Sequence, residues 1–410
     1  MKKFFIIAGF VGIIILLATF VSFAGCKATS KEPIKVGGPM PLTGFFAADG
    51  EMMKNGVELA IDEINKAGGL LGRQMELVTY DIEDNAAEKT IAAADTLILR
   101  DKVDVVVTGY AGVGADVEAF GKYDIIYLNG DGTYLASDLV RENPDYSNVF
   151  FTAGVEKDWG RQMIDTMNNL PYEFPNKKIA ILIGDYEWEL NVLGAARDRA
   201  AETGWEIAVD EVFPYYTVEW TPILTKIRDT EPSLILFEDV EPTDVETFVD
   251  QFLLDPTNSI VDIGYAMGLP QYVDLAATKH NGVLGWSTLA ALPNDVGKAF
   301  TESYKAKFGT EPGNMAAATY DSLMIWVNAV KALNNVEDHK AIEKYIEENV
   351  YTGVCGSYNY SLTDDHTVLA DSENIPMQHY QLQNGNKVLG YLGGKQVEGF
   401  TFEIPSWIEQ

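Results

Sequence analysis

Cysteine is scarce in this chain of 410 residues, which holds only Cys26 and Cys355. A domain outside the cytoplasm that depended on disulfides would carry more cysteines. If Cys26 carries a lipid, Cys355 has no partner. Stability must then come from core burial, and a chain of this length can supply it as two lobes.

Histidine is also rare, and the four histidines show no metal-ligand spacing: His280, His339, His366 and His379. Neither a G-x-S-x-G nucleophile elbow nor an H-E-x-x-H motif occurs. The paired carboxylates Asp364 and Asp365 are expected in a surface turn. We therefore expect no enzyme, no metal and no cofactor.

Basic residues are outnumbered, with 30 Lys and Arg against 61 Asp and Glu and a formal net charge of −31. Such a field repels nucleic acid and anionic lipid, so no nucleic-acid partner is expected. The charge does not identify a ligand, because an acidic surface usually serves only solubility.

The N-terminus carries two lysines, an apolar run from Phe4 to Phe23, and then Ala24, Gly25 and Cys26. This is the pattern of a secretory signal. Phe23-Ala24-Gly25-Cys26 resembles the bacterial lipobox, although its first position is more often Leu. The pattern predicts a lipoprotein signal at 1–25, lipid on Cys26, a tether at 26–33, and an extracytoplasmic location in the periplasm or on the outer face of the cytoplasmic membrane. The alternative is a retained transmembrane anchor, because about 20 apolar residues can span a bilayer.

Beyond the tether, apolar runs of strand length alternate with amphipathic segments of helical period. We expect strands at 34–38, 77–80, 103–107, 125–128, 179–183, 207–212, 234–237 and 261–265. Mostly apolar strands separated by helices predict an α/β fold with parallel sheets covered on both faces. The segment 150–153 is expected to lead from one unit into a second that packs closely against it.

Four stretches resemble a known family. They are 41–50, which is similar to its first loop; 55–69 with Leu71-Gly72-Arg73, similar to its first helix; Tyr80-Asp81 with Asp84-Asn85, similar to an acidic turn; and Tyr320-Asp321-Ser322-Leu323, similar to a late helix. The family is the branched-chain amino-acid-binding (Leu/Ile/Val-binding-like) type of periplasmic binding protein, which serves ABC transporters.

The resemblance implies the type I two-lobed fold, in which the chain crosses the hinge three times, here near Ala153, Gly285 and Cys355. Lobe one would comprise 34–152 and 285–355, and lobe two 153–284 and 356–410. The resemblance also implies capture of a small polar organic molecule, an amino acid or a related compound, by hinge closure and its delivery to an ABC permease.

In open parallel sheets, ligands bind at the carboxyl ends of the strands. That rule selects the loops 45–50, 109–116 and 129–134 in lobe one, and 184–191, 238–242 and 265–270 in lobe two. The candidate ligand-binding residues on these loops are Asp49, Tyr110, Gly112, Val113, Asp131, Gly132, Thr133, Asp185, Trp188, Glu238, Tyr265 and Ala266.

Several of these candidates have a second interpretation. Backbone N–H groups in the glycine-rich stretch 109–115 could bind a ligand carboxylate, or the glycines serve only a tight turn. Thr133 falls where the family offers a hydroxyl, or it caps a helix. Trp188 falls where the family places an aromatic wall, or it packs in the interior. Glu238 and Asp239 contact the ligand or are solvated.

The chain also departs from the family. The amino-acid binders use a side-chain hydroxyl where this chain has Val113 and Gly114, and the carboxylate that faces their ligand's ammonium falls on Ala266. A buried ammonium without an acidic partner is costly. Either Asp49, Asp131, Asp185 or Glu238 replaces that partner, or the ligand is an amide, an aromatic acid or a cation, which the aromatic residues of these loops would suit.

A ligand-binding sensor or receptor component is the main alternative function. A one-chain sensor would need a second membrane segment after the domain, and residues 400–410 hold none. A sensor that acts through a separate protein stays open at this point.

Overall fold

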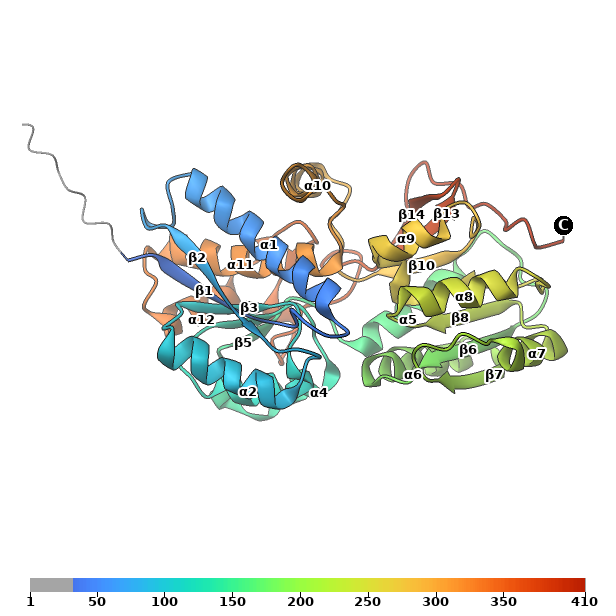
Figure 1. The fold of residues 1–410 in the computed structure, drawn as a ribbon, viewed down its shortest axis with the longest axis horizontal. Coiled ribbons are helices and arrows are strands. Elements are labelled where there is room, and N and C mark those ends of the chain that lie inside the picture. Colours follow the sequence, from blue (N-terminus) through green and yellow to red (C-terminus); the bar gives the residue numbers. More distant parts are fainter. Residues whose placement is uncertain (1–31, 410) are drawn as a thin grey trace, which may run out of the picture. The chain divides into compact units, whose positions relative to one another are not determined.

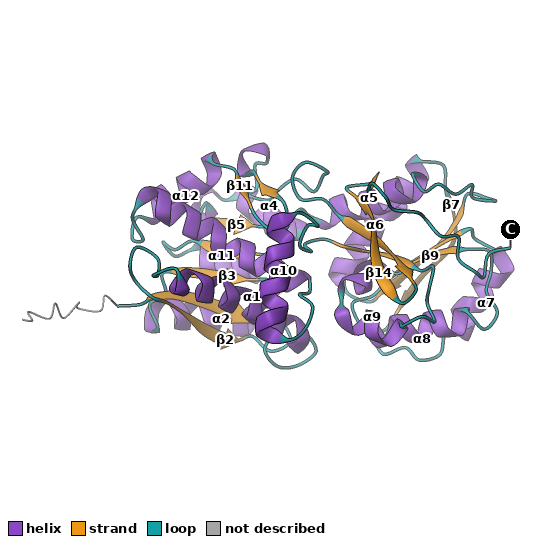
Figure 2. Ribbon diagram, turned by 90° about the horizontal axis from the view of Figure 1, so that it is seen from above, coloured by secondary structure: helices purple, strands orange, loops and turns teal. Residues whose placement is uncertain are grey.

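The structure, a computed structural model, describes residues 32–409, and Pro33–Gln410 form one compact unit. The predicted signal segment and Cys26 lie outside the described residues. The unit contains two large sheets with helices on their faces, which confirms the predicted two-lobed α/β fold (Figures 1 and 2).

The sheet of the first lobe is entirely parallel and has the strand order β2-β1-β3-β4-β5. Its strands are β1 (Ile34–Met40), β2 (Met75–Asp81), β3 (Val105–Thr108), β4 (Tyr127–Asn129) and β5 (Val149–Phe151). Its helices are α1 (Ala47–Lys66), α2 (Ala87–Asp95), α3 (Ala115–Gly121), α4 (Tyr134–Glu142), α10 (Asp295–Phe308), α11 (Asn314–Leu333) and α12 (His339–Glu348).

The sheet of the second lobe has the order β15-β14-β13-β10-β9-β8-β6-β7. The parallel strands are β6 (Lys178–Gly184), β7 (Glu206–Phe213), β8 (Leu234–Glu238), β9 (Ile260–Asp262) and β10 (Leu284–Ser287). The antiparallel strands β13 (Gln378–Gln383), β14 (Asn386–Leu392) and β15 (Lys395–Gln396) extend it at the β10 edge. Its helices are α5 (Glu156–Asn168), α6 (Glu187–Glu202), α7 (Thr221–Thr230), α8 (Pro242–Phe252) and α9 (Pro270–Ala276).

The apolar runs form central strands because helices bury both faces of each sheet. In β6, Ile179, Ile181 and Ile183 pack into one core with α5 and α6, whereas Ala180 and Leu182 pack into a second core with α7 to α9. In the first lobe, Val105 and Val107 face α1 and α11, whereas Val106 faces α2 to α4.

The expected strand at 261–265 is only partly correct, because β9 ends at Asp262 and a 3-10 helix, Gly264–Gly268, follows. Gly264 has a φ of 61°, a conformation that favours glycine and turns the chain out of the sheet. The turn places Tyr265 against the end of the neighbouring strand β8.

The chain passes between the lobes three times. It leaves the first lobe after β5, returns between β10 and α10, and leaves again before β13; the short pair β11 (Tyr351–Thr352) and β12 (Ser357–Tyr358) precedes that last passage. Gly285 lies inside β10 of the second sheet. The domain boundaries near Ala153, Gly285 and Cys355 stay predictions.

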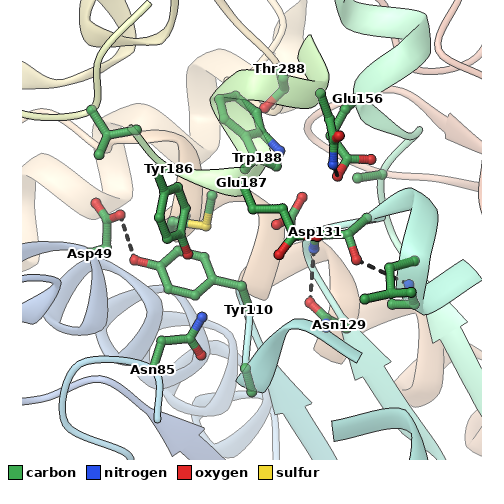
Figure 3. Close-up of a pocket in the computed structure, with 18 of the residues that line it drawn as sticks. Asp49, Asn85, Tyr110, Asn129, Asp131, Glu156, Tyr186, Glu187, Trp188 and Thr288 are labelled. Carbon is green, nitrogen blue, oxygen red and sulfur yellow. Dashed lines mark hydrogen bonds between the residues drawn. The ribbon is translucent and has the colours of Figure 1, made fainter. Parts of the chain in front are cut away.

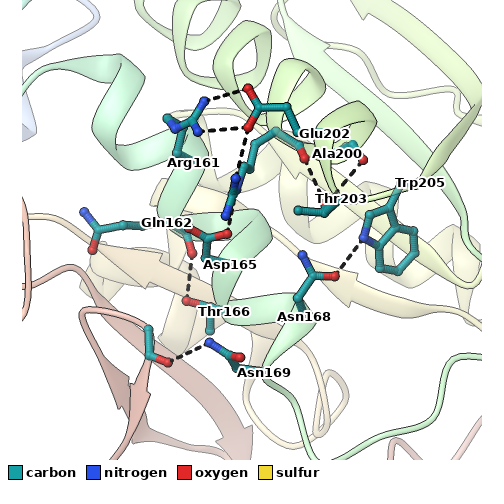
Figure 4. A network of polar contacts seen from close by, with 12 residues as sticks. Arg161, Gln162, Asp165, Thr166, Asn168, Asn169, Ala200, Glu202, Thr203 and Trp205 are labelled. Atoms are coloured by element: carbon teal, nitrogen blue, oxygen red, sulfur yellow. Dashed lines mark hydrogen bonds and ion pairs between the residues drawn. The ribbon is translucent and has the colours of Figure 1, made fainter.

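Helices α5 and α6 are joined by a polar network beside their apolar contact (Figure 4). Arg161 pairs with Glu202 at 2.9 Å, and Arg199 pairs with Asp165 at 2.7 Å. The N-terminal turns of both helices reach the cavity described below. None of the helices within residues 32–409 has the length and apolar composition needed to cross a bilayer.

Candidate functional site

A cavity of about 110 Å³ lies where the carboxyl ends of strands from both sheets meet (Figure 3). The chain before residue 155 contributes Phe46, Asp49, Asn85, Tyr110, Ala111, Gly114, Asp116, Asn129, Asp131, Thr133, Leu135, Ala136 and Ala153. The chain after it contributes Glu156, Trp159, Tyr186, Glu187, Trp188, Asn191, Val240, Tyr265, Thr288, Leu289 and Met315. The space has room for several water-sized groups and therefore for a small organic molecule.

Six of the predicted candidates line this cavity: Asp49, Tyr110, Asp131, Thr133, Trp188 and Tyr265. They come from loops far apart in the sequence, and the folding of two sheets brings them together. Whether they contact a ligand stays a prediction.

The remaining candidates lie elsewhere. Gly112, Gly132, Asp185, Glu238 and Ala266 are not among the lining residues, and the side chain of Val113 is outside the described part of the structure. Asp185 is exposed at the end of β6, whereas Tyr186 and Trp188 turn towards the cavity. Ala266 is fully buried in the core between the second sheet and α7 to α9.

Glu238 lies behind the cavity wall. One carboxyl oxygen accepts a hydrogen bond of 2.9 Å from the backbone N–H of Tyr265, and burial raises its pKa well above the usual value. The alternative that Glu238 and Asp239 are solvated is wrong, because the structure leaves neither side chain any exposed surface.

The two lobe-one loops that were predicted to bind a ligand carboxylate use backbone N–H groups internally. Gly112 N–H donates to Asn85 Oδ1 at 2.5 Å, and Gly114 N–H donates to Asp116 Oδ1 at 2.9 Å. At the start of α4, Tyr134 N–H donates to Glu156 Oε2 at 2.6 Å. Side chains of the chain itself therefore already satisfy these donors.

Thr133 caps a helix, which was one of its two interpretations, and its contact with a ligand stays a prediction. Its hydroxyl caps α4 by accepting from Ala136 N–H at 3.2 Å, and the residue also lines the cavity. Its oxygen therefore offers a ligand only the acceptor capacity and the proton that the cap leaves free.

Carboxyl groups dominate the polar lining. Burial raises the pKa of Asp131, and the neighbouring carboxylates of Glu156 and Asp116 raise it as well. Together they bring this pKa to about 8. Burial also raises the pKa of Asp49 to about 6, although the Tyr110 hydroxyl, which donates to Asp49 at 2.8 Å, opposes that shift. None of the described lining residues is a lysine, an arginine or a histidine.

Aromatic rings form the other large part of the lining. Trp188 meets Tyr265 edge to face, with ring centroids 5.6 Å apart, and Phe46 meets Tyr110 in the same way at 5.6 Å. Phe46 also lies 5.8 Å from Tyr186, which comes from the second lobe. Rings from both lobes therefore meet at this site.

Several lining residues were not predicted from the sequence, among them Asn85, Glu156, Tyr186 and Asn191. Asn85 and Tyr186 lie in stretches that it had singled out, so their position near strand ends was an available signal. Glu156 opens α5, directly after the first passage between the lobes, and Asn191 donates to its Oε1 at 3.3 Å. No sequence pattern pointed to Glu156, because its position at the cavity depends on how the two lobes come together.

The histidines have structural partners rather than a common site. His280 contacts Tyr272 and Asp250, and His379 contacts Asp262 at 2.5 Å. Within residues 32–409, no cluster of three or more His, Cys, Asp or Glu residues has a metal-binding arrangement.

The expected surface turn at Asp364 and Asp365 is correct for only one of the two residues. Asp364 is exposed, but Asp365 is buried, pairs with Arg141 and accepts from the hydroxyl of Thr367 at 2.6 Å.

Comparison with known proteins places the chain in a family. A family model described as "periplasmic binding protein" matches residues 33–386. The chain belongs to this family. Its two sheets, three passages and interlobe cavity agree with that membership.

Named relatives of this periplasmic binding protein support the same fold. A Leu/Ile/Val-binding protein homolog from Brucella melitensis is 24% identical over 357 residues, which cover 84% of this chain and 92% of the relative. A crystal structure from Silicibacter pomeroyi, provisionally assigned to branched-chain amino acid ABC transport, is 28% identical with a TM-score of 0.82 and covers 92% of this chain and 100% of its own. A substrate binding protein from Streptococcus pneumoniae in complex with isoleucine is 22% identical with a TM-score of 0.72, covering 87% of this chain and 99% of its own.

Proposed function

We propose that this periplasmic binding protein captures a small polar organic molecule, an amino acid or a related compound, between its lobes and delivers it to the permease of an ABC importer. The observation that carries the proposal is the cavity of about 110 Å³, which residues of both lobes line. The names of the relatives support the assignment to transport.

The proposed mechanism is hinge closure. A ligand that touches residues of both lobes binds the closed form more tightly than the open one, and this difference drives closure. Asp131 and Tyr110 on one side, with Trp188 and Glu187 on the other, supply such contacts.

The location is part of the proposal. The signal pattern before Cys26 supports export and a lipid anchor on the Cys26 thiol, which would hold the protein at the outer face of a membrane beside the permease. Cell fractionation of a Cys26→Ser variant tests the anchor. We expect the variant to leave the membrane fraction, and continued membrane association would overturn the lipid anchor.

Thermal-shift screening of the purified full chain tests capture itself. The panel comprises amino acids, amides, aromatic acids, amines and quaternary ammonium compounds. A ligand present at 100 times its Kd stabilises the folded form by about 2.7 kcal/mol, which raises the melting temperature measurably. If no compound in the panel raises it, capture of these solutes is rejected.

A sensor component is the alternative use of the same cavity. It predicts the same ligand-induced stabilisation but no uptake. Transport of the identified ligand into cells with and without the intact gene separates the two functions, since only the transport component is needed for uptake. We do not propose catalysis, and recovery of the bound ligand chemically unchanged is the expected result of prolonged incubation.

A further inference from the structure

Two backbone N–H groups in lobe one that could bind a ligand carboxylate are occupied by the chain's own acidic side chains. Glu156 Oε2 accepts from Tyr134 N–H at the start of α4, and Asp116 Oδ1 accepts from Gly114 N–H. A helix N-terminus favours a negative group, and here the protein supplies that group from its own α5.

Both internal carboxylates are held by further hydrogen bonds. Asp116 Oδ2 accepts from the Tyr127 hydroxyl at 2.7 Å and from Asn129 Nδ2 at 2.9 Å. Glu156 Oε1 accepts from Asn191 Nδ2 at 3.3 Å. Both side chains are almost fully buried. A ligand carboxylate would have to displace these bonds, which makes its binding there unfavourable.

The charge of the cavity lining also disfavours a ligand carboxylate. Five carboxyl groups line the cavity, from Asp49, Asp116, Asp131, Glu156 and Glu187. The described lining offers no basic side chain to an anion. Lys157 follows the lining residue Glu156 in the sequence, but its side chain is exposed, and its Nζ lies over the Tyr134 ring, 3.8 Å from the centroid. An anionic ligand would therefore be buried without a countercharge, which is strongly unfavourable.

Asp131 is a lining carboxyl group that is left for a ligand, and unlike the exposed Glu187 it is partly buried. Its backbone N–H is bonded to Asn129, but no group of the described chain donates a hydrogen bond to its carboxyl oxygens. Tyr110, Tyr186 and Trp188 stand in the same cavity, and aromatic faces attract cations (Figure 3).

We infer that the ligand of this cavity is an organic cation without a carboxylate, an amine or a quaternary ammonium, whose positive group binds at Asp131 among the aromatic rings. This inference rests on the proposed function and narrows its ligand class. Glu156 and Asp116 then disfavour amino acids, because they occupy the N–H groups of Tyr134 and Gly114, at which a ligand carboxylate could otherwise bind.

Calorimetry of the full chain with matched pairs tests the inference. The pairs are isoamylamine against leucine, and choline against glycine betaine, with isovalerate as the carboxylate that lacks an amine. We expect at least one cation to bind, and its carboxylate-bearing counterpart to bind at least tenfold more weakly. Tighter binding of leucine, betaine or isovalerate than of the matched cation overturns the inference and leaves capture intact. Absence of binding by every compound of the calorimetric pairs and of the thermal-shift panel overturns capture itself.

Substitution of the proposed partner gives a second test. Asp131→Asn keeps the size of the side chain and removes the carboxylate, which is ionised above its pKa of about 8, so cation affinity measured at pH 8.5 should fall at least tenfold. Asp198→Asn makes the same change at an exposed position of α6 outside the cavity and should alter affinity less than twofold. Unchanged cation affinity in the folded Asp131→Asn variant would overturn the assignment of Asp131 as the partner of the ligand's positive group.

Glu156→Gln tests the internal carboxylate. The change removes a negative charge beside Tyr134 N–H, so the ratio of leucine to isoamylamine affinity should rise severalfold. If that ratio stays constant in a variant that remains folded, Glu156 does not select against carboxylates.

Discussion

Trp188 illustrates what single residues contribute to this protein. It lies on the first turn of α6, is partly buried, and contacts Tyr265 and Trp286 at the wall of the cavity. The packing interpretation made from the sequence is therefore correct, and the ligand contact stays a prediction, because an indole ring is large enough to pack on one side and face a ligand on the other.

Replacing this ring should weaken ligand binding. We expect Trp188→Ala to raise the Kd by about 10- to 100-fold, since a buried aromatic contact contributes about 1.5–3 kcal/mol. Leu254→Ala is the control, because Leu254 is 83% exposed and distant from the lining residues. Calorimetry with the ligand found by screening measures both, and equal affinities for the two variants would show that Trp188 only packs.

The contact between α1 and α11 shows how a sequence feature acts at the scale of elements. These helices cover one face of the first sheet, and Gly56 of α1 packs directly against α11. A Cβ atom at residue 56 would overlap the Ala316 carbonyl and the Thr319 hydroxyl. The stretch 55–69 is one of those that carry the family resemblance, and this close approach gives a physical reason for its Gly56.

Gly56→Ala should therefore destabilise the fold by about 1–3 kcal/mol, since the helices must separate to admit the methyl group. Gly194→Ala, on α6, is the matched control, because its Cβ would meet nothing within 4 Å. That change should stabilise the protein by up to about 1 kcal/mol through helix propensity. Urea unfolding measures both variants, and destabilisation of equal size in the two would contradict the packing argument.

Across the whole molecule, the most unusual property is the number of buried carboxyl groups without a cationic partner. Behind the cavity, Glu189, Glu238 and Asp239 are completely buried, and each keeps one oxygen without a hydrogen-bond partner in the described chain. Burial raises the pKa of Glu189 to about 8 and that of Asp239 to about 9. With Asp131, these groups bind protons in the folded state at pH values where the unfolded chain has released them.

This difference predicts stability that rises on mild acidification. Between about pH 4 and pH 8 to 9 the folded state binds more protons than the unfolded state, so the free energy of unfolding falls as pH rises through that window. The melting temperature should be higher at pH 5.5 than at pH 8.5, and Asp239→Asn should flatten the dependence. A melting temperature that rises from pH 5.5 to pH 8.5 would contradict the assignment of these groups.

The sequence determined the fold class through a local rule. Apolar strands such as 179–183 alternate with amphipathic helices, and this alternation requires parallel sheets with both faces covered. It also located six lining residues, because strand ends mark the edge at which ligands bind. It did not reveal the antiparallel strands β13 to β15, whose mixed polar and apolar residues lack a distinct pattern.

Tertiary structure alone decided which groups occupy that edge. Glu156 and Asp116 follow different strands, and only the packing of the two lobes brings Glu156 against the N-terminus of α4. Likewise, whether Glu238 faces solvent, a ligand or the interior depends on the turn at Gly264 that lays Tyr265 over it. Strand ends are set by neighbours in the chain, whereas the charge and hydrogen bonding of the cavity depend on contacts between distant segments that no local pattern encodes.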